Sequence, residues 1–369
     1  MPHFNEFSNI TQCFPKCSIS LEKLNDTERQ QRIPPMIYLG VLICIGLPSN
    51  ITVILVFLKY FKKSTYRTYI VTLAIIDLTA CALCMPFEIF EMVFQYTFYW
   101  DVMCKTFRFL NTVVASLSNL VIFGLSLDRC RRVCKPLKHQ FTVTEARIFC
   151  FGTFLLCLLL SAPILWISGI RHVKLEQNIT GYDCGTADTY RKSMLPLIHN
   201  ISLFIVFAFN FTSLFVIYTK IAISICRQNR NRQTLQEIDS TRPNQRSPVY
   251  VINKMEENPR NGLSHSLPQT RSTRNTVSNR KSNSLKITKI AFAINLLYIL
   301  SYLPYLILNI WTSAKGSFVA KPGPLSSALL PIVTRTVFIN NICNPILYSF
   351  FDSRFRNNVK NIICSCFKK

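Results

Sequence analysis

The residues of this chain that could do chemistry are charged and amide side chains inside long apolar segments. Asp77 and Glu88 fall in one such segment, and Arg108 and Arg129 fall in the next. A charged group at membrane depth is costly unless it is paired or hydrated, so it marks a functional site by default. These charged positions are therefore the first candidates for functional residues.

Catalytic and metal-binding patterns are not visible in the sequence. A membrane enzyme would need a nucleophile paired with a base, or a cluster of metal ligands. The histidines never stand beside an acid or a cysteine at ligand spacing; they are His3, His139, His172, His199 and His265. A channel or transporter would be expected to show internal repeats, and none is visible. We therefore expect no enzyme activity and no catalytic residue.

The composition is that of a membrane protein. Apolar residues make up 49% of the 369 residues, charged residues 16%, and the formal net charge is +24. On a globular surface that charge would suggest nucleic acid, but here Lys and Arg gather in a few segments beside apolar runs. This distribution follows the positive-inside rule. We therefore expect membrane lipid as a partner and no nucleic acid.

Seven apolar runs are long enough to cross a membrane, since a spanning helix needs about 20 residues. The odd number places the termini on opposite sides, and the basic segments share one side if the N-terminus is extracellular. The predicted fold is an all-α membrane protein, a multi-pass seven-transmembrane helix bundle with a short amphipathic eighth helix. The bundle occupies residues 36–350, with spans at about 36–58, 69–94, 104–130, 146–170, 194–225, 285–311 and 326–350.

Three polar segments flank or interrupt the bundle. Residues 1–35 are predicted to be a glycosylated extracellular tail, in which the pairing of Cys13 and Cys17 stays open. Residues 227–284 are too polar to bury a core, so we predict a disordered, basic third intracellular loop, either a plain linker or a phosphorylated one. Residues 351–369 are predicted to form the amphipathic helix and cytoplasmic tail. The candidate modification sites are Asn9, Asn25 and Asn178 for glycosylation and Cys364 and Cys366 for palmitoylation.

Several short motifs occur in the order and at the spacing of a known family. They are Asn50, Leu73-Ala74-Ile75-Ile76-Asp77, Trp100 with Cys104, Asp128-Arg129-Cys130, Pro136-Leu137 and Asn344-Pro345-Ile346-Leu347-Tyr348. Together they resemble the landmarks of the class A, rhodopsin-like G-protein-coupled receptors over nearly the whole chain. The resemblance implies a receptor that binds an extracellular ligand, activates a heterotrimeric G protein, and interacts with arrestin and receptor kinases.

The resemblance also implies roles for individual residues. It implies a disulfide between Cys104 and Cys184, and a sodium ion near Asp77 as the one possible cofactor, with a purely structural polar cluster as the alternative. The sodium and polar pocket would contain Asn50, Asp77, Ser118, Asn340 and Asn344. The residues of G-protein coupling and activation would be Asp128, Arg129, Leu137, Tyr218, Asn344, Pro345 and Tyr348.

The chain departs from the family where the third, fifth and sixth spans meet. Tyr302 stands in place of the family's toggle Trp, two residues before the hinge at Pro304. Three positions that are apolar in the family are Asn119, Asn210 and Tyr298 here. We hypothesise that these three form a hydrogen-bonded connector, because an unsatisfied amide in an apolar bundle costs roughly a few kcal/mol.

The expected ligand site lies in the outer half of the bundle. Asn111 stands where amine receptors carry Asp, and the seventh span has no Lys for a retinal Schiff base, so neither ligand class is expected. Charges of both signs around an aromatic-lined cleft favour a peptide such as a neuropeptide, although Glu88 and Arg108 could simply pair with each other. The alternative is a class A receptor for a small-molecule or chemosensory ligand. The candidate residues are Glu88, Glu91, Arg108, Asn111, Tyr305, Asn309 and Thr334.

Overall fold

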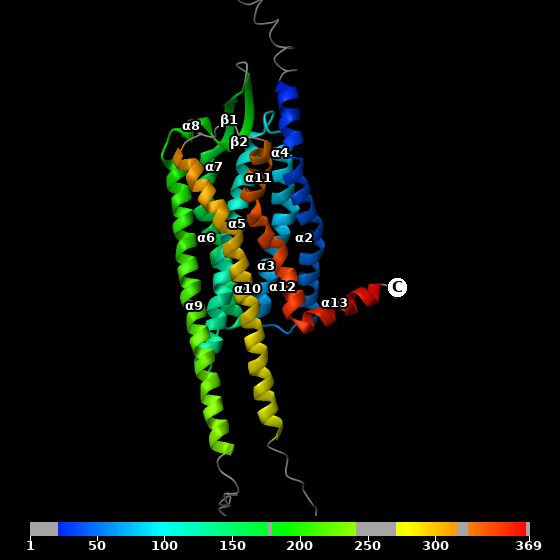
Figure 1. The fold of residues 1–369 in the computed structure, drawn as a ribbon, viewed down its shortest axis with the longest axis vertical. Helices are drawn as coiled ribbons and strands as arrows, with labels where there is room; N and C mark the ends of the chain where they lie inside the picture. The colour runs from blue at the N-terminus through cyan, green and yellow to red at the C-terminus, as the bar shows by residue number, and fades with distance from the viewer. Residues whose placement is uncertain (1–20, 176–178, 241–270, 316–323, 367–369) are drawn as a thin grey trace, which may run out of the picture.

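The computed structural model describes residues 21–175, 179–240, 271–315 and 324–366. The helices form an elongated bundle with a two-stranded hairpin at one end, and the short helix α13 (Ser353–Cys366) projects sideways near the other end (Figure 1). We call these the hairpin end and the α13 end.

Within the described residues, six helical stretches are long and apolar enough to span a membrane. They are α2 (Ile33–Tyr60), α3 (Thr65–Thr79) continued through η1 (Ala80–Cys84) into α4 (Met85–Val93), α5 (Asp101–Cys134), α6 (Val143–Ser161) continued by α7 (Ile164–Ile167), α9 (Leu195–Ser240) and α10 (Arg271–Lys315). The seventh crossing is built from α11 (Pro324–Thr334), the 3-10 turn η3 (Thr336–Phe338) and α12 (Ile339–Phe351). The predicted all-α, seven-helix membrane bundle is confirmed.

Helix α5 runs through the middle of the bundle and packs against α3, α6, α9 and α10. Its buried side chains include Val121, Ile122 and Leu125, which are completely enclosed. Helix α6 is peripheral, because it exposes large apolar side chains such as Phe151 and Leu159. In a bilayer this exposed apolar surface contacts lipid, so the hydrophobicity of α6 serves insertion more than packing.

A π-helical turn, η1, joins α3 to α4 within the second crossing. A π turn holds an extra residue, so the helix beyond it is rotated relative to the helix before it. Beyond this turn, Glu88 and Glu91 of α4 face the interior, where they are 5% and 9% exposed. The irregular turn therefore helps to place two carboxylates inside the bundle.

Two helices begin at side-chain caps near the α13 end. The Ser64 hydroxyl accepts a hydrogen bond from the backbone N–H of Arg67 at 3.2 Å, at the start of α3. At the start of α6, Thr142 and Glu145 form a capping box with reciprocal side chain to backbone bonds of 3.2 and 2.7 Å. Each cap satisfies donors that the helix itself leaves free.

The segment after the fourth crossing is a strand, which corrects the predicted span of 146–170. β1 (Ser168–Lys174) pairs antiparallel with β2 (Thr180–Thr186), in a register that sets Ile170 opposite Cys184. The backbone N–H of Ala187 also bonds the carbonyl of Ile167 at 2.9 Å, which ties the hairpin to the end of α7. The chain leaves the helix here because its backbone groups find partners in the second strand.

The predicted disorder over 227–284 is wrong at both ends of that range. Helix α9 continues to Ser240, and α10 begins at Arg271, so both project beyond the rest of the bundle at the α13 end (Figure 1). Neither 227–240 nor 271–284 contains Gly or Pro, so nothing in these stretches interrupts a helix that has already formed. Residues 241–270 lie outside the described part of the chain.

Residues 21–31 are also helical, although the first 35 residues were predicted to be a tail. Asn25 anchors this helix. Its Nδ2 donates to the carbonyl of Val93 at 3.0 Å, and its Oδ1 accepts from the N–H of Tyr96 at 2.9 Å. The Asn25 amide therefore satisfies two backbone groups at the end of α4, much as a capping residue does. The side chain is 6% exposed.

This geometry contradicts the predicted glycosylation at Asn25. A glycan on Nδ2 would need the space that the end of α4 occupies, and Asn25 is almost completely buried. We therefore expect no glycan at Asn25, so treatment with peptide N-glycosidase should give the same mass shift in Thr27→Ala, which lacks the sequon, as in the unmodified chain. A smaller shift in Thr27→Ala would contradict this arrangement. The other two predicted glycosylation sites, Asn9 and Asn178, lie outside the described residues.

Helix α13 is amphipathic, as predicted. Asp352 precedes it and accepts hydrogen bonds from the N–H groups of Arg354 and Phe355 at 3.0 and 3.3 Å. Phe355 is 2% exposed and packs with Val359 and Ile362 against the main core. Cys364 is exposed, while the side chain of Cys366 lies outside the described part. Palmitoylation of these cysteines stays a prediction.

Candidate ligand site and switch

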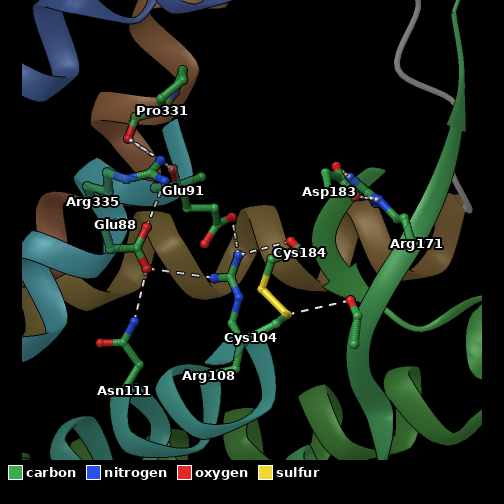
Figure 2. Close-up of polar contacts among 12 residues, drawn as sticks. Glu88, Glu91, Cys104, Arg108, Asn111, Arg171, Asp183, Cys184, Pro331 and Arg335 are labelled. Atoms are coloured by element: carbon green, nitrogen blue, oxygen red, sulfur yellow. Dashed lines mark hydrogen bonds and ion pairs between the residues drawn. A yellow bond between two sulfur atoms is a disulfide. The ribbon is translucent and has the colours of Figure 1, made fainter. Parts of the chain in front are cut away.

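A disulfide fixes the hairpin above the start of α5. Cys104 of α5 is bonded to Cys184 of β2, with their Cα atoms 5.6 Å apart (Figure 2). The bond links residues 80 positions apart in the chain. It therefore closes a long loop and holds β2 over the interior of the bundle.

Below the hairpin, Glu88 of α4 binds groups from two other helices (Figure 2). Its Oε2 pairs with Nη2 of Arg335 at 2.7 Å, and its Oε1 accepts from Nδ2 of Asn111 at 2.9 Å. Nη1 of Arg108 lies 3.7 Å from the same Oε1. Glu88 thus joins α4 to α5 and to the break between α11 and η3.

Arg108 also binds the second carboxylate of α4. Its Nη2 is 2.5 Å from Oε1 of Glu91 and 3.4 Å from the backbone carbonyl of Cys184. The sequence left open whether Glu88 and Arg108 face a ligand or pair with each other. In this structure they pair, at 3.7 Å. The Arg108 side chain is 31% exposed and that of Glu91 11%, so breaking the Arg108–Glu91 pair would cost the more enclosed carboxylate its partner.

The hairpin carries a separate ion pair above this network. Arg171 of β1 and Asp183 of β2 are directly opposite in the register, and their two contacts are 2.7 and 2.6 Å. Burial acts to lower the pKa of Arg171, but the hydrogen bonds and charge of Asp183 outweigh it and raise that pKa. Arg171 therefore stays charged and holds the two strands in register.

The network leaves two polar atoms available. Oε2 of Glu91 and Nε of Arg335 are buried with no hydrogen-bond partner among the described residues. One is an acceptor and the other a donor, so a ligand group of either kind would find a partner here once the network opens to admit it.

The predicted ligand-site residues do not all join this network. Thr334 contacts the network only through Arg335, whose Nη1 donates to its hydroxyl at 3.4 Å, while the hydroxyl itself donates to the carbonyl of Pro331 at 3.0 Å. Tyr305 packs against the main apolar core, and the side chain of Asn309 lies outside the described part. The sequence analysis missed Arg335. A single arginine within the apolar run 326–350 was the signal that could have revealed it.

A second polar cluster surrounds Asp77 in the middle of the bundle. Its Oδ1 accepts from Nδ2 of Asn341 at 2.9 Å, and its Oδ2 accepts from Nδ2 of Asn344 at 2.7 Å. Asn50 donates to the backbone carbonyl of Asn341 at 2.9 Å. Asn341 was not among the predicted residues, although it stands only three positions before Asn344 of the NPxxY motif.

Ser118 and Asn340, also predicted for the Asp77 pocket, contact each other instead. Nδ2 of Asn340 donates to the Ser118 hydroxyl at 3.3 Å, and neither has a hydrogen bond to Asp77 in the described structure. The donor set around Asp77 nevertheless fits a hard cation. Asp77 is a fully enclosed carboxylate, and Oδ1 of Asn50, Asn340 and Asn344 are buried without a partner in the described part of the chain. Carboxylate and amide oxygens are the ligands that such ions prefer.

Two of the three hypothesised connector residues are in contact. Nδ2 of Asn210 donates to Oδ1 of Asn119, and the same nitrogen lies 3.4 Å from the Asn119 backbone carbonyl. Both amides are buried, so this bond joins α5 to α9 inside the core. Tyr298 instead packs its ring against Tyr302, with ring centroids 4.4 Å apart. Its contribution to the connector is therefore aromatic packing.

We expect the Asn119–Asn210 bond to show strong coupling in a double-mutant cycle. Asn119→Leu alone leaves Asn210 buried without its partner, which should cost about 1–3 kcal/mol in stability. Asn119→Leu with Asn210→Leu should cost less than the sum of the two single changes. Thermal unfolding of the purified receptor measures the cycle. Basal signalling should change in the single variants, and additive stabilities with unchanged basal and stimulated signalling would contradict the role of the bond.

At the α13 end, Asp128 holds two arginines. It pairs with Arg129, its neighbour in the chain, and with Nε of Arg132 at 3.1 Å. Arg132 in turn donates to the Thr65 hydroxyl on α3 at 2.8 Å. The Arg129 guanidinium lies over the ring of Tyr66, 5.6 Å from its centroid. Arg129 is 3% exposed, so in this structure it is withdrawn from the surface.

Neither predicted switch tyrosine, Tyr218 or Tyr348, makes a hydrogen bond to Arg129 in the described structure. The Tyr218 hydroxyl is 3.2 Å from the Ser126 hydroxyl and accepts from Nδ2 of Asn295 at 2.9 Å, which joins α5, α9 and α10. Tyr348 of α12 is 1% exposed, and its hydroxyl has no partner among the described residues. Asn295 was missed by the sequence analysis. Of the remaining predicted positions, Leu137 is fully exposed, while Pro304 and Pro345 lie inside α10 and α12.

The comparisons with known proteins define the family. The family model described as "7 transmembrane receptor (rhodopsin family)" matches residues 49–348. That range covers most of the chain, and the chain therefore belongs to the rhodopsin family of seven-transmembrane receptors. Since the relatives are receptors, the expectation that this chain is not an enzyme is confirmed.

Several individual receptors are similar to this chain. The cholecystokinin receptor type A of Cavia porcellus is 22% identical over 89% of this chain and 80% of the relative. The neuropeptide Y receptor type 1 of Xenopus laevis is 22% identical over the same shares, 89% and 80%. The cysteinyl leukotriene receptor 1 of Homo sapiens is 27% identical over 51% of this chain and 56% of the relative.

Among solved structures, squid rhodopsin superposes with a TM-score of 0.67 at 17% identity, covering 93% of this chain and 87% of that one. At this identity the likeness shows the fold alone.

Proposed function

We propose that this chain is a plasma-membrane receptor that binds an extracellular peptide at the hairpin end and activates a heterotrimeric G protein at the α13 end. Its N-terminus is then extracellular, and arrestin and receptor kinases act at the same end as the G protein. Membership of the receptor family supports the general role. The relatives named for cholecystokinin and neuropeptide Y favour a peptide ligand.

The observation that carries the peptide proposal is the charge network around Glu88. It combines carboxylates and guanidinium groups from three crossings, and two of its buried atoms lack a partner among the described residues. A peptide carries charged termini, side chains and backbone amides, so it can bind several such groups at once. A small apolar ligand would offer no partner to the two unpaired atoms.

Activation follows from a shift between two populations of the bundle. In the structure Asp128 holds Arg129, and hydrogen bonds at Tyr218 tie α5, α9 and α10 together. A ligand that binds the open form more tightly than the closed form moves the equilibrium toward the open form. Outward movement of α10 about Pro304 would then release these contacts and admit the G protein.

A sodium ion is part of the proposal, held by Asp77 and the amide oxygens around it. The ion would supply the positive charge that this buried carboxylate lacks among its contacts. We expect sodium chloride to raise the Tm of the purified receptor by a few degrees relative to potassium chloride, because binding to the folded state stabilises it. Asp77→Asn should abolish the difference between the two salts. Equal melting of the unmodified receptor in both salts would argue against the ion.

A ligand screen distinguishes a peptide receptor from the alternative. We expect transfected cells to give a second-messenger response to members of a neuropeptide library, and Arg129→Ala to lose the response while surface expression is kept. The variant Lys105→Ala, in an exposed pair with Asp101, is the matched control and should respond normally. Responses to small metabolites or odorants alone would favour a small-molecule or chemosensory receptor.

A further inference from the structure

Two cysteines near the α13 end of α5 play no part in the features described above. Cys130 and Cys134 are one helical turn apart, both are half-buried, and their Sγ atoms are 3.9 Å apart. Cys130 stands at the position where members of this receptor family carry Tyr. Both side chains border the small apolar cluster of Val133, Ile217 and Ile221, where α5 packs against α9.

The distance between the two sulfur atoms matches a metal site. A tetrahedral zinc ion with Zn–S bonds of about 2.3 Å separates two of its sulfur ligands by about 3.8 Å. A disulfide would need the sulfur atoms to approach to about 2 Å within one rigid helical turn. The reducing cytoplasm also favours free thiols. We propose that Cys130 and Cys134 together bind one thiophilic divalent cation, Zn²⁺ or Cd²⁺.

The basic surroundings do not oppose this binding. Arg131, Arg132 and Lys135 adjoin the two cysteines, and Lys220 faces them from α9. When the cation binds, each thiol releases its proton to solvent and forms one sulfur–metal bond, so no oxidation or reduction occurs. Two protons are replaced by one divalent cation, and the charge of the site stays the same.

The remaining ligands of the cation would not be His, Cys, Asp or Glu side chains. Within the described residues no group of three or more His, Cys, Asp and Glu could hold a metal. The backbone carbonyl of Lys220 lies 3.5 Å from Sγ of Cys134, so α9 offers an oxygen as a third donor, and water completes the site. Two thiolates with weak additional ligands give reversible binding, in contrast to a closed structural zinc site.

The position of the site predicts an effect on signalling, and this part rests on the proposed function. Cys130 follows Arg129 in the chain, and a cation shared with the Lys220 carbonyl would tie α5 to α9. We expect the bound cation to reduce G-protein activation, because it opposes separation of the helices around Arg129.

Direct binding is tested first, on the purified full chain in detergent. Titration with Cd²⁺ is followed by the ultraviolet absorbance of the thiolate–cadmium bond. We expect one equivalent of this signal to be lost, or its affinity to fall at least tenfold, in Cys130→Ser and in Cys134→Ser. Cys226→Ser, which removes an exposed cysteine on α9, is the matched control and should bind like the unmodified chain. Unchanged binding in both Cys130→Ser and Cys134→Ser would overturn the proposal.

Cys130→Ser could disturb packing against α9 and fail to fold. In that case the binding of Cd²⁺ is measured with Cys134→Ala instead. The effect on signalling is a separate readout. Zn²⁺ should lower nucleotide exchange by the G protein with the unmodified receptor and have no effect with Cys134→Ala. If Cd²⁺ binds as expected but exchange does not respond to Zn²⁺, the regulatory role is overturned. A receptor that never activates a G protein would refute the proposed function, while the binding titration would still decide the metal site.

Discussion

Replacing Glu88 with glutamine should destabilise the receptor by about 3–5 kcal/mol, because Arg335 then lies buried without its carboxylate. Glu88 contacts Arg335, Arg108 and Asn111 together, so its loss affects three helical crossings. We expect a fall of roughly 10 °C in the apparent Tm of the purified protein, with a matching loss of receptor at the cell surface.

The control for this prediction removes both charges. In Glu88→Met with Arg335→Met, no unpaired charge remains at that contact, and Arg108 keeps its 2.5 Å contact with Glu91. We expect this double variant to be more stable than Glu88→Gln, since an apolar pair of similar size often replaces a buried ion pair at little cost. If the double variant is as unstable as the single one, the network stabilises the bundle by shape and not by charge.

Asp128→Asn should raise basal G-protein activation by about tenfold, which corresponds to roughly 1.4 kcal/mol of bias toward the open form. Asp128 is completely buried and holds both Arg129 and Arg132. A neutral amide binds these guanidinium groups less strongly than a carboxylate does. The substitution therefore destabilises the closed form more than an open form in which Arg129 has moved away. The measurement is nucleotide exchange by the G protein without ligand.

The matched control is Asp101→Asn on the same helix. Asp101 lies at the hairpin end, where its pair with Lys105 is exposed, and exposed pairs of this kind contribute at most about 1 kcal/mol. We expect its basal activity to equal that of the unmodified receptor. A basal activity in Asp128→Asn that also equals the unmodified value would show that Asp128 does not restrain Arg129.

The helical crossings could be predicted because length and hydrophobicity alone define them. The 34-residue helix α5 and the other long apolar runs satisfy this criterion without any knowledge of their neighbours. The β1–β2 hairpin could not be predicted, since its seven-residue strands exist only because each pairs with the other. The last residues of the predicted fourth span belong to β1 for that reason.

The candidate sites were predictable to the extent that they consist of charged residues in apolar runs. Glu88 and Arg108 were identified in this way, and Arg335 satisfies the same criterion but was overlooked. Asn295 and Asn341 are different, because polar amides are common in membrane helices and only the fold brings them to Tyr218 and Asp77. The burial of Asn25 likewise depends on the docking of residues 21–31 against the end of α4, which no local pattern reveals.

Ligand-driven nucleotide exchange tests the central proposal most directly. The purified receptor is placed in lipid nanodiscs with a heterotrimeric G protein, and binding of a GTP analogue is measured with and without a peptide found in the cellular screen. The proposed function predicts faster exchange with the peptide, no acceleration in Arg129→Ala, and normal acceleration in Lys105→Ala. Equal acceleration in Arg129→Ala, or exchange that no peptide alters while the receptor binds it, would contradict the proposed coupling of the hairpin end to the α13 end.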